Sequence, residues 1–283
     1  MIETTNKTKL LGIFGTPIAH TLSPMMHSYM AKKSGIDMAY LAFDVLPEEL
    51  ETAVCGAKML GATGFNITAP HKIEIMKYID VISDEAQYMN SVNTIVNRDG
   101  LWYGYNTDGD GFCKSLLLEG HEICNKRILM MGAGGSARSL CYKLAQYGAK
   151  SISITARTEK NVHIIGEMIE KYTDTKFYDT YHPSDTYDMV INTTPLGMHP
   201  YEDKNPCDFM DMITEDVLCC DIIYNPNKTL FLKSAEGNGA KIVNGLGMLI
   251  TQGILAFEHF HGVALDHKSV YDELMQLMQT YRI

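Results

Sequence analysis

A glycine-rich turn between a strand pattern and a helix pattern constrains the fold of this 283-residue chain more than any other feature. The apolar run at residues 128–131 is followed at once by GAGGSARS, after which apolar residues recur with helical spacing. Gly132, Gly134 and Ala137 match the pattern G-x-G-x-x-A, in which glycines let the backbone approach a pyrophosphate. The helix N-terminus that follows offers free N–H groups to such an anion. Strand, turn and helix together predict a Rossmann-type unit, and the alternative is a tight turn that binds no ligand.

The next strand pattern, SISIT, indicates which dinucleotide such a unit binds, because it ends in Ala156, Arg157 and Thr158. NAD enzymes place a carboxylate at this tip for the ribose 2′-hydroxyl, whereas NADP enzymes tend to place Arg there for the 2′-phosphate. No carboxylate stands here, and a guanidinium beside a hydroxyl suits a phosphate, so the sequence favours NADP. The alternative is an exposed arginine and a helix-capping threonine. The predicted nucleotide-binding residues are Gly132, Ala133, Gly134, Gly135, Ser136, Ala137, Arg157 and Thr158.

Short apolar runs alternate with helical patterns on both sides of a break near residue 107. The first part contains the strand patterns KLLGIF, AYLAFDV and GFNIT, and its first helix pattern has Ser23 at the N-cap, Pro24 at N1 and Gly35 past the end. This alternation predicts two α/β units with largely parallel sheets covered by helices on both faces. One segment departs from it, because Asp99-Gly100 between two β-rich runs predicts a hairpin.

Composition excludes several classes of partner. A formal net charge of −10 argues against a nucleic-acid ligand, and no apolar run reaches the roughly 18 residues that a membrane helix needs. Seven cysteines without a C-x-x-C pair indicate free thiols, and the N-terminal apolar stretch is too short for a signal peptide, so we expect a cytoplasmic protein. The ten histidines show no zinc-ligand spacing beside cysteines, so no metal site is expected.

Three polar clusters lie at predicted strand ends or turns of the first unit, in HTLSP, in NITAPHK, and in SVNT with NTDGDGF. Ligands of open α/β sheets collect at the carboxyl ends of strands, so the clusters are expected to converge. Hydroxyls, amides and one Lys–Asp pair fit a small polyhydroxylated carboxylate. The cluster residues are Thr21, Ser23, Asn66, Thr68, Lys72, Asn93 and Asp108.

Each of these side chains also has a purely structural interpretation. Ser23 and Thr68 alone would be helix caps, the latter for a helix containing Lys72. Lys72 alone would be a solvated lysine, and Asp108 alone a turn or N-cap residue. Their joint occurrence favours a binding site, but their spacing does not identify a substrate.

Eight ordered blocks of the chain resemble the shikimate/quinate dehydrogenase family. They are GTPIAHTLSPMMH, GFNITAPHK, SVNTI, GYNTDGDGF, MGAGGSARS, INTTPLGM, DIIYNP and NGLGMLITQG, and they span nearly the whole chain. The resemblance implies a two-domain α/β protein that reversibly reduces 3-dehydroshikimate to shikimate with NADPH. It also implies a substrate-binding domain at residues 1–107, completed by helices at 245–283, and a doubly wound Rossmann domain at 108–244. The family includes monomers and homodimers.

The resemblance further implies roles for individual residues. Thr21 and Ser23 would bind the substrate carboxylate, with Tyr224 near it. The ring hydroxyls would be bound by Thr68, Asn93, Asp108 and Gln252. Lys72 and Asp108 would form the catalytic pair, with the division of acid and base roles left open, and Gly245 and Met248 would lie near the nicotinamide.

Two residues depart from the family pattern. Thr21 stands where a serine is usual, which keeps the hydroxyl but adds a methyl group and could shift preference between shikimate and the bulkier quinate. Ala156 stands where an asparagine is usual, so NADP preference should weaken without reversing. The alternatives are a quinate/shikimate dehydrogenase of broader scope that accepts NAD, another two-domain NADP enzyme such as a folate-pathway dehydrogenase, and a non-catalytic nucleotide-binding sensor.

Overall fold

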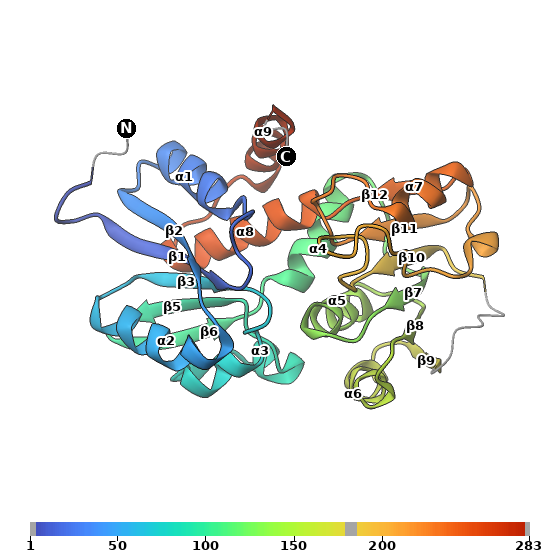
Figure 1. Cartoon of the computed structure of the whole chain (residues 1–283), viewed down its shortest axis with the longest axis horizontal. Helices are drawn as coiled ribbons and strands as arrows, with labels where there is room; N and C mark the ends of the chain where they lie inside the picture. Colours follow the sequence, from blue (N-terminus) through green and yellow to red (C-terminus); the bar gives the residue numbers. More distant parts are fainter. Residues whose placement is uncertain (1–3, 179–185, 281–283) are drawn as a thin grey trace. The chain divides into compact units, whose positions relative to one another are not determined.

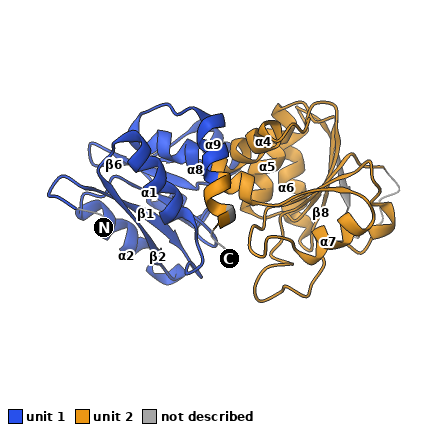
Figure 2. Ribbon diagram, turned by 90° about the horizontal axis from the view of Figure 1, so that it is seen from above, with its two compact units in different colours: residues 1–107, 252–274 blue, residues 108–251, 275–283 orange. Residues whose placement is uncertain are grey.

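The computed structural model describes residues 4–178 and 186–280, which form two compact units. Unit 1 comprises residues 1–107 and 252–274, and unit 2 comprises residues 108–251 and 275–283 (Figure 2). Each unit has its own six-stranded sheet with helices packed on it (Figure 1). All seven cysteines are free thiols. Within the part of the chain that is described, no helix is both long and apolar enough to span a membrane.

The sheet of unit 1 is mixed, with the strand order β2-β1-β3-β5-β6-β4. β1 pairs in parallel with β2 and β3, whereas β5 runs antiparallel to both β3 and β6. The predicted hairpin is confirmed, since Asp99 and Gly100 join β5 to β6 with φ values of 54° and 82°, the positive values that a two-residue turn requires. The bounds are β1 (Lys9–Gly15), β2 (Met38–Asp44), β3 (Gly64–Ile67), β4 (Val81–Ile82), β5 (Thr94–Arg98) and β6 (Leu101–Tyr105).

Side chains alternate across β3 and divide the packing of unit 1 into two layers. Phe65 and Ile67 enter an apolar core with Phe14 and Trp102, and the rings of Phe14 and Phe65 stack with centroids 4.2 Å apart. The helices that cover this core are α2 (Leu50–Met59), the short 3-10 helix η2 (Glu74–Tyr78), and α3 (Asp84–Met89). A second 3-10 helix, η1 (Pro47–Glu49), leads directly into α2. Gly64 faces the other layer, where it lies against Phe260 of α8 (Leu246–His261).

The first helix, α1 (Ser23–Ser34), begins differently from the prediction. Ser23 is the first helical residue, Leu22 occupies the N-cap, and no side chain caps the helix, so the N-cap assignment of Ser23 was wrong. Pro24 lies in the first turn and Gly35 ends the helix with φ 64°, which confirms both boundary signals. Because Ser23 is not used as a cap, its hydroxyl remains available for other contacts.

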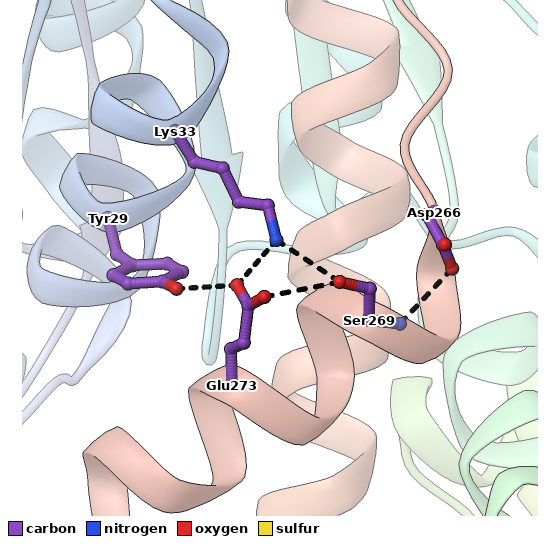
Figure 3. A network of polar contacts seen from close by, with 5 residues as sticks. All are labelled: Tyr29, Lys33, Asp266, Ser269 and Glu273. Atoms are coloured by element: carbon purple, nitrogen blue, oxygen red, sulfur yellow. Dashed lines mark hydrogen bonds and ion pairs between the residues drawn. The ribbon is translucent and has the colours of Figure 1, made fainter.

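A polar network attaches α9 (His267–Thr280) to α1 (Figure 3). Glu273 accepts hydrogen bonds from the Tyr29 hydroxyl at 2.6 Å and from the Lys33 ammonium at 2.5 Å. Lys33 also donates to Ser269 at 3.2 Å, and the backbone N–H of Ser269 donates to Asp266 at 3.1 Å. The ion pair is more than one-third exposed, so screening by solvent keeps its contribution to stability small.

The sheet of unit 2 has the strand order β12-β11-β10-β7-β8-β9, and every pairing is parallel. Read along the chain from β7, this is the doubly wound order, in which the sheet grows outward in both directions from its first strand. Strand order reverses between β7 and β10, which is where such sheets bind ligands. The strands are β7 (Arg127–Met131), β8 (Ser151–Thr155), β9 (Asp174–Tyr178), β10 (Met189–Asn192), β11 (Leu218–Asp221) and β12 (Lys241–Val243).

Two groups of helices cover unit 2. An apolar core under β7, β10 and β11 is closed by α7 (Leu230–Gly237) and the 3-10 helix η3 (Met210–Met212). Elsewhere α4 (Asp108–Leu118) packs on α5 (Gly135–Gln146), which is followed by α6 (Glu159–Ile169). A partly buried ion pair at 2.9 Å joins Asp110 of α4 to Lys143 of α5. α4 approaches α5 so closely that a Cβ atom on Gly109 would overlap the Ser139 carbonyl. Asp108, the first residue of α4, is therefore fixed to the helix that follows the glycine-rich turn.

We expect Gly64→Ala to lower the free energy of unfolding by about 1 to 3 kcal/mol, because the added methyl meets packed atoms that have little room to move. A Cβ atom there would lie 2.6 Å from the Ile95 carbonyl oxygen and 2.6 Å from the Phe260 ring. The matched control is Gly56→Ala in α2, where nothing lies within 4 Å and alanine should stabilise by up to about 1 kcal/mol. Urea unfolding of the two variants measures the contrast, and equal effects at both sites would contradict this packing.

Candidate functional site

The glycine-rich turn lies where the predicted pyrophosphate site requires it, between the end of β7 and the start of α5. Gly132 has φ 111°, and a Cβ atom on it would lie 2.5 Å from the Thr193 hydroxyl oxygen, so glycine is needed both for conformation and for space. Gly134 is exposed, and nothing lies within 4 Å of the position that its Cβ would take. Ala137 is fully buried under the first turn of α5. The turn therefore leaves open backbone at a helix N-terminus, which fits a dinucleotide pyrophosphate.

The tip of β8 presents the residues predicted to bind the 2′-phosphate. Arg157 and Thr158 are exposed directly after the strand, and Thr158 occupies the N-cap of α6. Its side chain makes no capping hydrogen bond, so the helix-cap interpretation of this threonine is not supported. Ala156 brings no polar group to the same tip. The exposed Arg157 guanidinium and Thr158 hydroxyl form no capping hydrogen bond to the helix, and both groups suit a phosphate ligand.

The two hydroxyls of the first polar cluster lie together in unit 1. The Thr21 hydroxyl donates to the Ser23 hydroxyl oxygen at 3.1 Å, and Ser23 is buried. The Tyr40 hydroxyl of β2 donates to the amide oxygen of Asn66 on β3 at 2.7 Å. The Asn66 amide nitrogen donates to the Asn93 carbonyl and to the Thr94 hydroxyl, so the amide is occupied by protein partners.

The second and third clusters of unit 1 are joined through Asn93. Its amide oxygen accepts the Thr107 backbone N–H at 2.8 Å, its amide nitrogen donates to the Thr107 hydroxyl at 2.9 Å, and its carbonyl accepts the Ile67 N–H at 2.8 Å. The Lys72 carbonyl accepts the N–H of Val92, the residue before Asn93, at 2.8 Å. These bonds bring the segments that carry Thr68, Lys72 and Asn93 together, and Asp108 follows Thr107 directly in the chain.

The structure also corrects the local context of Thr68 and Lys72. Residues 69–73 form a turn, and the following 3-10 helix η2 has Ile73 at its N-cap, so Lys72 is not in a helix that Thr68 caps. Thr68 is held instead by its backbone N–H, which donates to the Phe14 carbonyl at 2.9 Å, and by its methyl group against Gly15. Lys72 is half-buried and Asp108 is buried. A helix-cap explanation is therefore removed for Thr68 as it was for Ser23.

The remaining predicted residues lie in the turn after β11, in the turn before α8, and in α8 itself. Tyr224 is half-buried in the turn after β11, and the N–H of Gly245 donates to the Ile223 carbonyl at 3.0 Å. A Cβ atom on Gly245 would overlap the Ile222 carbonyl, so this close approach requires glycine. Met248 is buried in α8, and Gln252, half-buried, is the first residue of that helix assigned to unit 1.

A buried layer of aromatic rings in unit 1 was not predicted from the sequence. His27 of α1 is fully buried, and its ring stacks on the Tyr40 ring with centroids 4.2 Å apart and planes 3° apart. Burial, and to a lesser degree the nearby His261, lowers the pKa of His27 to about 3, against a weaker opposing effect of Asn66. The signal was present, because Ser23, His27 and Met30 follow the i, i+4, i+7 spacing of a buried helix face.

These observations define an α/β dinucleotide-binding protein. Its unit 2 has a Rossmann fold, and its unit 1 carries clustered hydroxyl and amide side chains that suit a ligand rich in oxygen atoms. Among the described residues, no group of three or more His, Cys, Asp or Glu side chains could hold a metal ion. Residues 13–95 match the model of the shikimate dehydrogenase substrate binding domain.

Relatives and solved structures match over nearly the whole length. The shikimate dehydrogenase (NADP(+)) of Methanocaldococcus jannaschii is 43% identical over 263 residues, which cover 91% of this chain and 93% of that protein. A crystal structure of a shikimate dehydrogenase in complex with NADP⁺ is 41% identical, with a TM-score of 0.87 and 97% of each chain covered. The Listeria monocytogenes enzyme in complex with shikimate and NAD is 35% identical, with a TM-score of 0.83 and 96% and 98% coverage. The chain belongs to the shikimate dehydrogenase family.

The open space at Gly134 gives a test of the nucleotide site that does not need activity. We expect Gly134→Ala to weaken NADPH binding by about tenfold or more, because the methyl group enters the space through which a pyrophosphate approaches the backbone. Stability should be unchanged, since the methyl meets no protein atom within 4 Å. Fluorescence titration with NADPH measures the affinity. Gly237→Ala in α7, also open within 4 Å, is the control and should bind NADPH like the wild type; equal affinity in both variants would argue against this site.

The buried His27 ring predicts acid sensitivity in unit 1. Its pKa in the folded state, about 3, lies below the ordinary value of 6.5, so stability is complete above about pH 6.5 and is lost as the pH falls. His27 alone should remove about 2 kcal/mol between about pH 6.5 and about pH 5. Urea unfolding across this range should show a smaller loss for His27→Leu than for the wild type. His199→Leu changes an exposed histidine and should follow the wild-type curve; parallel curves for all three proteins would contradict the assignment.

Proposed function

We propose that this protein catalyses the reversible NADP-dependent reduction of 3-dehydroshikimate to shikimate, a step of chorismate and aromatic amino acid biosynthesis. The observation that carries the proposal is the combination, in one family member, of an open glycine turn at the strand-order reversal of unit 2 with the hydrogen-bonded polar clusters of unit 1. The relatives named for this reaction match the chain over more than nine-tenths of its length.

When bound, NADPH would supply the hydride that the ring ketone carbon receives. The Lys72 side chain donates the proton that the carbonyl oxygen needs and stabilises the negative charge that develops on it. Asp108 is its partner, and the two together with Asn93 orient the ring hydroxyls. Thr21, Ser23 and Tyr224 hold the carboxylate by hydroxyl donors, and Thr68 and Gln252 complete the contacts to the ring.

On the cofactor side, Arg157 and Thr158 would hold the 2′-phosphate, and the N-terminal turn of α5 with residues 132–137 would hold the pyrophosphate. Gly245 and Met248 would lie near the nicotinamide. In this assignment residues 1–107, with the helices at 245–283, form the substrate-binding domain, and residues 108–244 form the NADP-binding domain. A cytoplasmic location and a monomeric or homodimeric state stay predictions from the sequence.

The Lys72→Met variant tests the proposal. We expect the wild type to reduce NADP⁺ in the presence of shikimate, and the variant to lose activity by a factor of about 10² to 10⁴, because the proton donor is gone. Absorbance of the reduced nicotinamide measures the rate. Lys77→Met, which removes an exposed lysine of η2 from the same segment, is the control and should retain wild-type turnover. Full activity of Lys72→Met would exclude Lys72 as the proton carrier.

A broader quinate/shikimate dehydrogenase is the second candidate. Ala156 brings no polar side chain to the tip of β8, which favours broader nucleotide use, and the methyl group of Thr21 leaves the preference between shikimate and the bulkier quinate to be measured. Comparing kcat/KM for shikimate and quinate, each with NADP⁺ and NAD⁺, distinguishes the two candidates. A kcat/KM ratio near one, either between shikimate and quinate or between NADP⁺ and NAD⁺, would favour the broader enzyme.

A further inference from the structure

Asp221 is a buried carboxylate at the carboxyl end of β11 whose role the proposed function leaves open. It is 1% exposed and has four short contacts from three donors. The Asn192 amide nitrogen lies 3.1 and 3.2 Å from its two oxygens, the Ile223 backbone N–H donates to Oδ1 at 3.0 Å, and the Thr229 hydroxyl donates to Oδ2 at 2.8 Å. One side chain thus joins the ends of β10 and β11 to the start of α7.

Through Asn192, this carboxylate shapes the turn that follows β10. The Asn192 amide oxygen accepts the Thr194 N–H at 2.9 Å and the Thr194 hydroxyl at 2.7 Å, and its amide nitrogen also donates to the Leu196 carbonyl at 3.2 Å. Asp221 orients this amide, because only a nitrogen facing the carboxylate leaves the oxygen facing Thr194. On the far side of the turn, Gly197 packs against the Thr229 side chain.

The same turn contacts the nucleotide-binding backbone. The Thr193 hydroxyl donates to the Met131 carbonyl at 2.8 Å, and its oxygen would lie 2.5 Å from a Cβ atom on Gly132. The position of Thr193 therefore restricts the path of the backbone from the end of β7 into the glycine-rich turn at residues 132–137.

Asp221 also fixes the segment that carries Tyr224. The Ile223 N–H is bound to the carboxylate, and the Ile223 carbonyl accepts the N–H of Gly245 at 3.0 Å. The backbone between Asp221 and Tyr224 is thereby held at both ends and set against the start of α8.

We propose that Asp221 is a positioning residue that sets the geometry of three ligand-binding segments of unit 2: the glycine turn at 132–137, the turn carrying Tyr224, and the segment from Gly245 to Met248. This inference rests on the proposed function, since it takes these segments to bind NADP and the substrate carboxylate.

The energetics of the carboxylate agree with a role in positioning. Burial raises the pKa of Asp221 to about 6, and hydrogen bonds from Ile223, Thr229 and Asn192 only partly oppose this. No charged group contributes to that shift, and the neighbouring Cys220 thiol stays neutral because burial raises its pKa well above the ordinary value. A carboxyl whose folded-state pKa lies above its ordinary 3.8 reduces stability as the pH rises from about 4 through about 6. At neutral pH the ionised group therefore reduces stability, while its acceptor oxygens order the turns.

The experiment compares Asp221→Asn with Asp188→Asn. Both carboxylates lie in unit 2, but Asp188 precedes β10 at the amino edge of the sheet, where it binds Arg127 at 2.7 to 3.0 Å. We expect Asp221→Asn to raise the Kd for NADPH and the KM for shikimate by about tenfold each, as for loss of one charge-assisted hydrogen bond. Asp188→Asn should leave both constants at the wild-type values even where it lowers the melting temperature. Equal constants in the two variants would overturn the proposal.

A second pair of variants keeps the test decisive if Asp221→Asn does not fold. Thr229→Val removes the hydroxyl donor and Thr229→Ser retains it, so the valine variant should shift both constants by about threefold and the serine variant should not. Identical constants for valine and serine would count against the proposal. A further readout is the pH dependence of stability: the difference in the free energy of unfolding between Asp221→Asn and the wild type should change between about pH 4 and about pH 6, because the destabilising ionisation of Asp221 is absent from the variant. Absence of shikimate turnover in the wild type would overturn the proposed function instead, while the NADPH titrations would still test the geometry of the nucleotide turn.

Discussion

The close approach of the turns that follow β7 and β10 is the constraint on which unit 2 depends. Parallel strands end at the same edge of a sheet, and reversal of strand order at this point forces two adjacent turns to leave in different directions. Here the Thr193 hydroxyl fills the space beside Gly132, so no side chain larger than hydrogen fits there. The exposed backbone at Gly134 follows from this arrangement, because the chain must bend sharply before α5 begins.

Unit 1 achieves a comparable arrangement with a neutral side chain. Asn93 is buried, and its side-chain amide both accepts a hydrogen bond from the Thr107 N–H and donates one to the Thr107 hydroxyl. Its backbone carbonyl accepts a hydrogen bond from the Ile67 N–H. Since buried polar groups cost stability unless they are bonded, each of these contacts restricts where the strand ends lie. Backbone hydrogen bonds hold Ile67, the neighbour of Thr68, to Asn93, and hold Lys72 to Val92.

Local signals in the sequence predicted the parts of the structure that depend on backbone chemistry. Gly35 and Asp99-Gly100 mark positions where positive φ is needed, and the structure confirms both; Gly132, predicted only as a glycine of the pyrophosphate pattern, also has positive φ. The N-cap prediction for Ser23 failed because α1 begins one residue earlier than capping preference suggests, with Leu22 at the N-cap, and the Ser23 hydroxyl accepts a hydrogen bond from Thr21 instead. The helical spacing of Ser23, His27 and Met30 could have indicated that His27 is buried. The stacking of His27 on Tyr40 and the contacts of Asp221 could not be predicted, since both depend on which elements become neighbours in the fold.

The different chemistry of the two buried side chains has a physical consequence. Asn93 satisfies a hydroxyl and an N–H with one amide and carries no charge, so its contacts are the same at all physiological pH values. Asp221 must receive hydrogen bonds only, and all the donors that it binds are neutral. A protonated Asp221 would need an acceptor of its own, and the turns around it offer donors instead. The same bonds that define the ligand-side turns therefore require the ionised carboxylate, which burial disfavours, and this conflict is expected where a site needs geometry more than stability.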